Sequence, residues 1–103
     1  MRVCEQLKPK KVFAYFEDIC QIPHGSRNTK AISDYCVSFA KDHNLKYIQD
    51  EDNNVVIFKD ASAGYEASEP IIIQGHLDMV CEKESGVDID FEKDGLRLYV
   101  DGD

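Results

Sequence analysis

The sequence has 103 residues, of which 43% are hydrophobic and 31% are charged, and its formal net charge is −8. This length gives one small domain or part of a larger one. The acidic balance argues against nucleic acid and anionic membranes as partners, because both require a positive protein surface. The first residues lack the apolar run of a signal peptide, and no stretch approaches the roughly 18 apolar residues of a membrane span. We therefore expect a cytoplasmic protein.

The cysteines predict neither a zinc ribbon nor a redox pair. The four of them are Cys4, Cys20, Cys36 and Cys81, and no two form a C-x-x-C motif. Without a signal peptide, an even number of cysteines does not by itself indicate disulfides. We interpret them as reduced, mostly buried thiols of a cytosolic chain.

Two helices are predicted in the first half. Residues 10–20 carry apolar side chains at the spacing of one helical face. Pro23 and Gly25 then end that helix. Ser26 or Asn28 can cap a second helix. Its apolar face consists of Ile32, Tyr35, Cys36 and Phe39. Asn44 is predicted to adopt the left-handed conformation after this helix.

Strands are predicted in the second half. Residues 46–59 form two strands around the polar turn DEDNN. Residues 70–75, PIIIQG, form a short apolar strand without alternation, which is typical of a strand covered on both faces. Residues 90–103 form a second hairpin with its turn at Asp94–Gly95. The fold class expected is thus α/β with a mixed sheet, in the order two helices, hairpin, buried strand, hairpin.

His76 and Asp78 follow the apolar strand and are the candidate site residues. Side chains two residues apart point to the same side of an extended chain. A metal-binding His usually donates its second ring N–H to a carboxylate, which fixes the tautomer and raises the basicity of the ligating nitrogen. His-x-Asp therefore has the ingredients of a metal ligand and its orienting partner. A structural His76, and an Asp78 that caps a following helix, remain alternatives.

The other polar candidates are interpreted as structural. His43 falls at the end of the second helix, where a cationic imidazole suits the helix dipole, and His24 lies in the Pro-Gly loop. The acidic run 86–94, GVDIDFEKD, lacks the glycine and the closing Glu of a calcium loop. No phosphate-binding loop and no G-x-S-x-G motif is present.

The stretch QGHLDMVCEK resembles the first metal-site motif of the aminoacyl-histidine dipeptidases. These enzymes, also called Xaa-His or cytosol nonspecific dipeptidases, are a branch of the zinc aminoacylase and carboxypeptidase superfamily. The segments ICQIPHGSRNTKAISDYCVSFAKDHNL, QDEDNNVVI and DFEKDGLRLYVDGD resemble the neighbouring parts of the same family. The resemblance extends from about Lys11 to the last residue.

The resemblance implies that His76 ligates one zinc of a two-zinc centre. It implies that Asp78 hydrogen-bonds this imidazole and belongs to the catalytic residues. The substrate implied is a dipeptide, including Xaa-His, and a homodimer of the intact enzyme is compatible with it. Relatives continue into a Gly-Thr-Thr-Leu-Gly type segment with a bridging Asp, then a Glu-Glu pair, another Asp and a late His. They also carry an inserted second domain.

Residues 1–103 are therefore expected to be the N-terminal part of a metallopeptidase catalytic domain, inactive alone because they supply one zinc ligand. A non-catalytic binding or interaction module is the alternative. A third interpretation, a tripeptidase or aminoacylase specificity, is disfavoured by QGHLDMVCEK.

Overall fold

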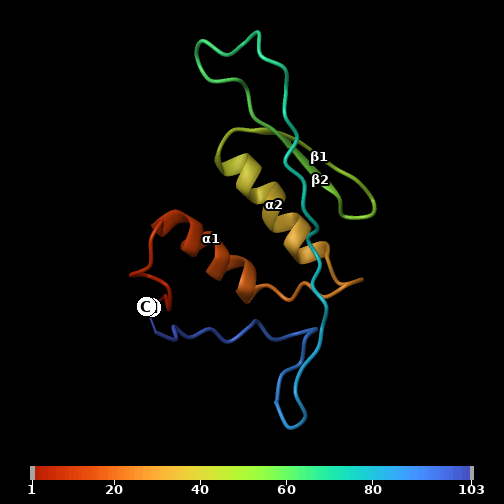
Figure 1. The fold of residues 1–103 in the computed structure, drawn as a ribbon. Coiled ribbons are helices and arrows are strands. Elements are labelled where there is room, and N and C mark those ends of the chain that lie inside the picture. Colours follow the sequence, from red (N-terminus) through yellow and green to blue (C-terminus); the bar gives the residue numbers. More distant parts are fainter. Residues whose placement is uncertain (1, 103) are drawn as a thin grey trace. The chain divides into compact units, whose positions relative to one another are not determined.

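A computed structural model describes residues 2–102. The chain divides into two compact units, Met1–Ile32 with Asp78–Asp103, and Ser33–Leu77. Figure 1 shows the helices α1 and α2 and the strands β1 and β2, which are the regular elements of the described residues. The helices and the first hairpin appear in the predicted order. The α/β class is therefore confirmed.

Helix α1, Lys10–Gln21, belongs to the first unit and matches the predicted range. Its buried side chains are Glu17 and Cys20, which lie three residues apart on one face. The helix ends as the N–H of Ile22 bonds to the carbonyl of Ile19 at 3.1 Å. Pro23, which has no N–H to continue the helix, follows directly.

Helix α2, Lys30–Asp42, begins in the first unit and continues through the second. Its buried residues recur at helical spacing and are Ile32, Ser33, Val37 and Ala40. The predicted left-handed Asn44 is confirmed, with φ of 55°. The N–H groups of Asn44 and Leu45 bond to the carbonyls of Lys41 and Ala40, at 3.1 Å and 2.8 Å. This is the Schellman arrangement, which satisfies the last carbonyls of the helix.

The strands β1, Lys46–Gln49, and β2, Val55–Phe58, form the predicted antiparallel hairpin. Ile48 pairs with Val56 in its register. The amide of Gln49 donates to the hydroxyl of Ser33 and to the carboxylate of Asp34, at 2.8 Å and 3.0 Å. These bonds tie β1 to the part of α2 that lies in the second unit.

The buried strand predicted over residues 70–75 is not present in the structure. This segment has no regular structure, and Ile71, Ile72 and Ile73 are 85%, 92% and 92% exposed. A strand needs a neighbour for its backbone N–H and C=O groups. Among residues 2–102, β1 and β2 form the only sheet, and they pair with each other. An apolar run predicts burial but does not supply the neighbouring strands.

Over residues 90–102, the described part of the second predicted hairpin, no strands form, because the turn lies earlier. The N–H groups of Lys93 and Asp94 bond to the carbonyl of Asp90, at 3.0 Å and 2.7 Å. The carboxylate of Asp94 accepts from the N–H of Asp90 at 2.8 Å and closes the same turn. Leu96 then donates its N–H to the carbonyl of Cys20 at 2.7 Å, at the end of α1. The N–H of Leu96 therefore bonds to α1 and not to a neighbouring strand.

The four cysteines are free thiols, as predicted. Cys4 and Cys20 are buried and Cys36 is half-buried, but Cys81 is exposed. Burial raises the pKa of the Cys20 and Cys36 thiols. Within residues 2–102, neither helix is long and apolar enough to cross a membrane.

Candidate functional site

The candidate residues His76 and Asp78 lie on either side of the boundary between the two units. His76, in the second unit, is exposed, and Asp78, in the first, is half-buried. The segment before them is the exposed, irregular run Ile71–Gly75. The role of His76 as a metal ligand and of Asp78 as its partner stays a prediction.

Asp78 is held by the loop that precedes α2. The hydroxyl of Ser26 donates to Oδ2 of Asp78 at 2.5 Å. Next to this contact the backbone forms a short parallel bridge between Gly25 and Met79. In it the N–H of Met79 bonds to the carbonyl of His24 at 2.9 Å, and the N–H of Ser26 bonds to the carbonyl of Met79 at 3.2 Å. Three hydrogen bonds thus fix this loop to the segment that carries Asp78.

The loop itself is a tight turn from Gly25 to Asn28. The N–H of Asn28 bonds to the carbonyl of Gly25 at 2.9 Å, and Arg27, the third residue, has φ of 70°. A positive φ at this position is typical of a type II turn, where glycine or asparagine is usual. Arginine there costs on the order of 1 kcal/mol of backbone strain. The structure therefore holds this turn against a local preference.

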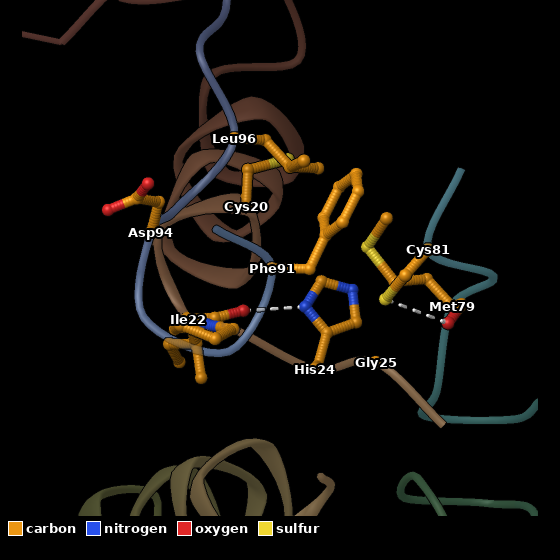
Figure 2. A pocket seen from close by; sticks show the side chains of 10 residues that line it. Cys20, Ile22, His24, Gly25, Met79, Cys81, Phe91, Asp94 and Leu96 are labelled. Atoms are coloured by element: carbon orange, nitrogen blue, oxygen red, sulfur yellow. Dashed lines mark hydrogen bonds between the residues drawn. The ribbon is translucent and has the colours of Figure 1, made fainter. Parts of the chain in front are cut away.

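The turn approaches the following segment closely at Gly25. A Cβ atom on Gly25 would lie 2.4 Å from the sulfur of Cys81, so a side chain there requires Cys81 to move. Gly25, Cys81, Met79 and His24 line a small cavity in the first unit, which Figure 2 shows. Its volume is about 10 Å³, which is the space of a single water molecule. The cavity is too small for a peptide substrate.

The other histidines have local backbone partners. Nδ1 of His24 lies 2.6 Å from the carbonyl oxygen of Ile22, in the same half-buried loop (Figure 2). Nδ1 of His43 lies 2.8 Å from the carbonyl oxygen of Phe39, and the two rings stack with centroids 4.1 Å apart. His43 is exposed, as predicted. Both contacts agree with a structural role.

A second group of polar contacts, which the sequence did not indicate, joins the N-terminal segment to α1. The buried carboxylate of Glu17 accepts a hydrogen bond from the N–H of Cys4. Burial alone would raise the pKa of Glu17, but the hydrogen bonds from Cys4 and Val3 outweigh it and lower that pKa. Arg2 forms an ion pair with Asp18 at 2.7 Å. Glu17 and its neighbours thus anchor the first residues.

The donor types of the candidate pair suit a zinc centre, since imidazole nitrogen and carboxylate oxygen are both common zinc ligands. Their number is insufficient. Among residues 2–102, no three His, Cys, Asp or Glu side chains are arranged to hold a metal ion. Within the described residues the pair therefore does not complete a metal site, and its part in one stays a prediction.

Sequence reasoning missed the role of Ser26, which it considered only as a helix cap. Ser26 and Asp78 are separated by 52 residues in the chain. No local pattern links residues so far apart, so the contact is visible only in the structure.

No family model matches the chain. The chain is 37% identical over all its 103 residues to the cytosol non-specific dipeptidase of Escherichia coli (strain K12), and it spans 21% of that protein. Its fold matches the crystal structure of an aminoacylhistidine dipeptidase from Vibrio alginolyticus with a TM-score of 0.89 and 35% identity. That match covers 95% of this chain and 20% of the other. The predicted resemblance to the aminoacyl-histidine dipeptidases is confirmed, for about one fifth of such a protein.

Proposed function

We propose that the chain supplies part of the catalytic domain of a dipeptidase of the aminoacyl-histidine group. The observation that carries this proposal is the similarity to two such dipeptidases, which extends over the segment QGHLDMVCEK. The chain spans about a fifth of either relative. The activity of a whole enzyme, a cytosolic location and dipeptide substrates, including Xaa-His, all belong to the proposal. The proposal also includes a remaining part of the catalytic domain and an inserted second domain, which are not among these 103 residues.

His76 and Asp78 have separate tasks in this proposal. One ring nitrogen of His76 would bind a zinc ion, and the carboxylate of Asp78 would accept a hydrogen bond from the N–H of the other ring nitrogen. That hydrogen bond selects the tautomer in which the ligating nitrogen has its lone pair free, and it makes this nitrogen more basic. When bound, the two zinc ions supply an acidified water molecule and polarise the peptide carbonyl.

The chain alone is proposed to be inactive. A catalytic zinc normally has three protein ligands and an open position for water. The absence of any such group of three side chains among residues 2–102 supports this proposal. A general base is also required to accept the proton of the attacking water, and in this proposal Asp78 is assigned to the His76 imidazole instead.

The experiment is a chimera in which this chain replaces the matching fifth of the Escherichia coli enzyme. The chimera is expected to release amino acids from a dipeptide. His76→Ala should lower kcat/KM by about 100-fold or more, because a metal ligand is lost and effects of this size arise even from its hydrogen-bond partners.

His43→Ala is the matched control, because it removes an exposed imidazole that already has a local partner. It should leave the rate unchanged. A folded chimera without activity, or one in which His76→Ala is as active as the parent, would contradict the proposal and favour a non-catalytic module.

A further inference from the structure

The contact between Ser26 and Asp78 is embedded in backbone hydrogen bonds that do not involve either side chain. The N–H of Met79 bonds to the carbonyl of His24, and the N–H of Ser26 bonds to the carbonyl of Met79. These two bonds already fasten the loop to the segment after His76. The hydroxyl of Ser26 adds a third bond, and this one reaches the Asp78 carboxylate at 2.5 Å. Because the backbone bonds already hold the loop, the bond from the Ser26 hydroxyl mainly affects the position of the Asp78 side chain.

We propose that Ser26 is a positioning residue for Asp78. By donating to Oδ2, the hydroxyl holds Asp78 in one side-chain rotamer, and so fixes the position of the carboxylate that is assigned to the His76 imidazole. The proposal rests on the proposed function, because the value of this orientation depends on the roles of His76 and Asp78 there.

A hydrogen bond from the Ser26 hydroxyl is expected to orient the Asp78 carboxylate. The first torsion of an aspartate side chain has three staggered wells and its last torsion is broad, so a half-buried carboxylate without a partner can occupy several positions. A short hydrogen bond to one oxygen restricts these positions, and bonds to a charged acceptor are the stronger ones. Outer partners of this kind orient the groups that hold a metal, and their loss typically costs 10- to 100-fold in activity or metal affinity.

The turn that places Ser26 next to Asp78 has an unfavourable backbone conformation. The turn requires Arg27 in the left-handed region, with φ of 70°. The absence of a side chain at Gly25 allows the backbone to approach Cys81. Both features bring the second residue of the turn, Ser26, next to Asp78.

The test uses the chimera described above with three substitutions. Ser26→Ala should lower kcat about 10- to 100-fold with a much smaller change in KM. Ser26→Thr, which keeps the hydroxyl, should restore most of the rate. Ser38→Ala makes the same chemical change at an exposed position of α2 and should have no effect.

A second measurement on the chain itself is independent of activity. NMR couplings of the Asp78 Cγ atom to the backbone report the Cα–Cβ torsion, which decides where the Asp78 carboxylate lies relative to Ser26. We expect one rotamer in the parent chain and in Ser26→Thr, and averaging over several in Ser26→Ala. An unchanged rotamer in Ser26→Ala would overturn the proposal, and so would an unchanged kcat.

The variant Ser26→Val, which has the shape of Ser26→Thr without its hydroxyl, separates positioning from packing. It should resemble Ser26→Ala in rate and rotamer while it folds normally. Loss of folding in both variants would overturn the proposal, because Ser26 would then be a structural residue. If the proposed function itself is wrong, the measurements give a different result. In that case the parent chimera is inactive, or His76→Ala has no effect, while the Asp78 rotamer still responds to Ser26→Ala.

Discussion

Gly95 lies against the backbone of α1, and a side chain has no room there. A Cβ atom at this position would lie 2.8 Å from Cα and 2.9 Å from the carbonyl oxygen of Gln21. Backbone atoms cannot rotate away as the end of a side chain can. The neighbouring bond from Leu96 to the carbonyl of Cys20 depends on the same close approach.

Gly95→Ala is therefore expected to destabilise the chain by about 1–3 kcal/mol, the usual cost of forcing atoms into an occupied space. Gly75→Ala is the matched control, since no atom lies within 4 Å of its Cβ position. That change should stay within about 0.5 kcal/mol. Urea unfolding of the two variants measures the difference, and equal midpoints would show that Gly95 is not closely packed.

At the level of single residues, the sequence predicted positions with a strong local signal. Asn44 was predicted from its place after a helical pattern, and His43 from its place at the helix end. The contacts of Ser26 and Glu17 were not predicted. Their partners, Asp78 and Cys4, are distant in the sequence. Their roles depend on tertiary contacts that no window of sequence contains.

The hairpin β1–β2 is organised by the carboxylate of Asp50. Oδ1 accepts from the N–H groups of Asp52 and Asn54, at 3.0 Å and 2.8 Å. Oδ2 accepts from the side-chain amide of Asn54 at 2.8 Å. The hydrogen bonds from Asn54, followed by that from Asp52, lower the pKa of Asp50 below its ordinary value of 3.8.

This lowered pKa predicts an acid-sensitive hairpin. The folded turn binds the proton less readily than the unfolded chain, so the contribution of Asp50 is complete above pH 3.8. It is lost as the pH falls below that value through the lower folded pKa. NMR Hα shifts of β1 and β2 should therefore move towards random-coil values in this acid range.

Asp50→Asn should abolish most of this acid response and weaken the hairpin at neutral pH. Asp52→Asn is the control, because it removes the same charge from the same turn. Identical acid responses in the parent chain and Asp50→Asn would contradict the assignment of the hydrogen bonds to Asp50.

At the level of elements, amphipathic helices and the polar turn DEDNN were predictable, because their signals repeat within a few residues. The segment Ile71–Ile73 was not, because a strand depends on neighbours elsewhere. The turn at Asp90–Asp94 was missed for a related reason. Asp94–Gly95 suggests a turn by composition, whereas the hydrogen bonds of Asp90 and Asp94 close it earlier.

At the level of the whole molecule, the exposed isoleucines Ile71–Ile73 agree with the proposal that the chain is part of a larger catalytic domain. Side chains such as Ile72 and Ile73, each 92% exposed, form the kind of apolar surface that proteins normally cover. In the proposed enzyme the remaining part of the catalytic domain would cover them. The sequence predicted this segment as a covered strand, and the relatives, of which the chain spans about a fifth, have the additional length.

The candidate site was predictable only in part for the same reason. His-x-Asp after an apolar run indicated a ligand and its partner, and the resemblance gave each residue a role. Among residues 2–102 no three His, Cys, Asp or Glu side chains are arranged to hold a metal ion, so a complete centre needs further ligands. The roles of His76 and Asp78 therefore stay a prediction from a local motif, and that motif contains no information on the geometry of an assembled site.

The most direct test of this account is the crystal structure of the zinc-loaded chimera, with anomalous diffraction recorded at the zinc absorption edge. The account predicts a zinc ion about 2.1 Å from a ring nitrogen of His76, with Asp78 hydrogen-bonded to the other nitrogen. Zinc bound at the centre with His76 outside its coordination shell would contradict the account.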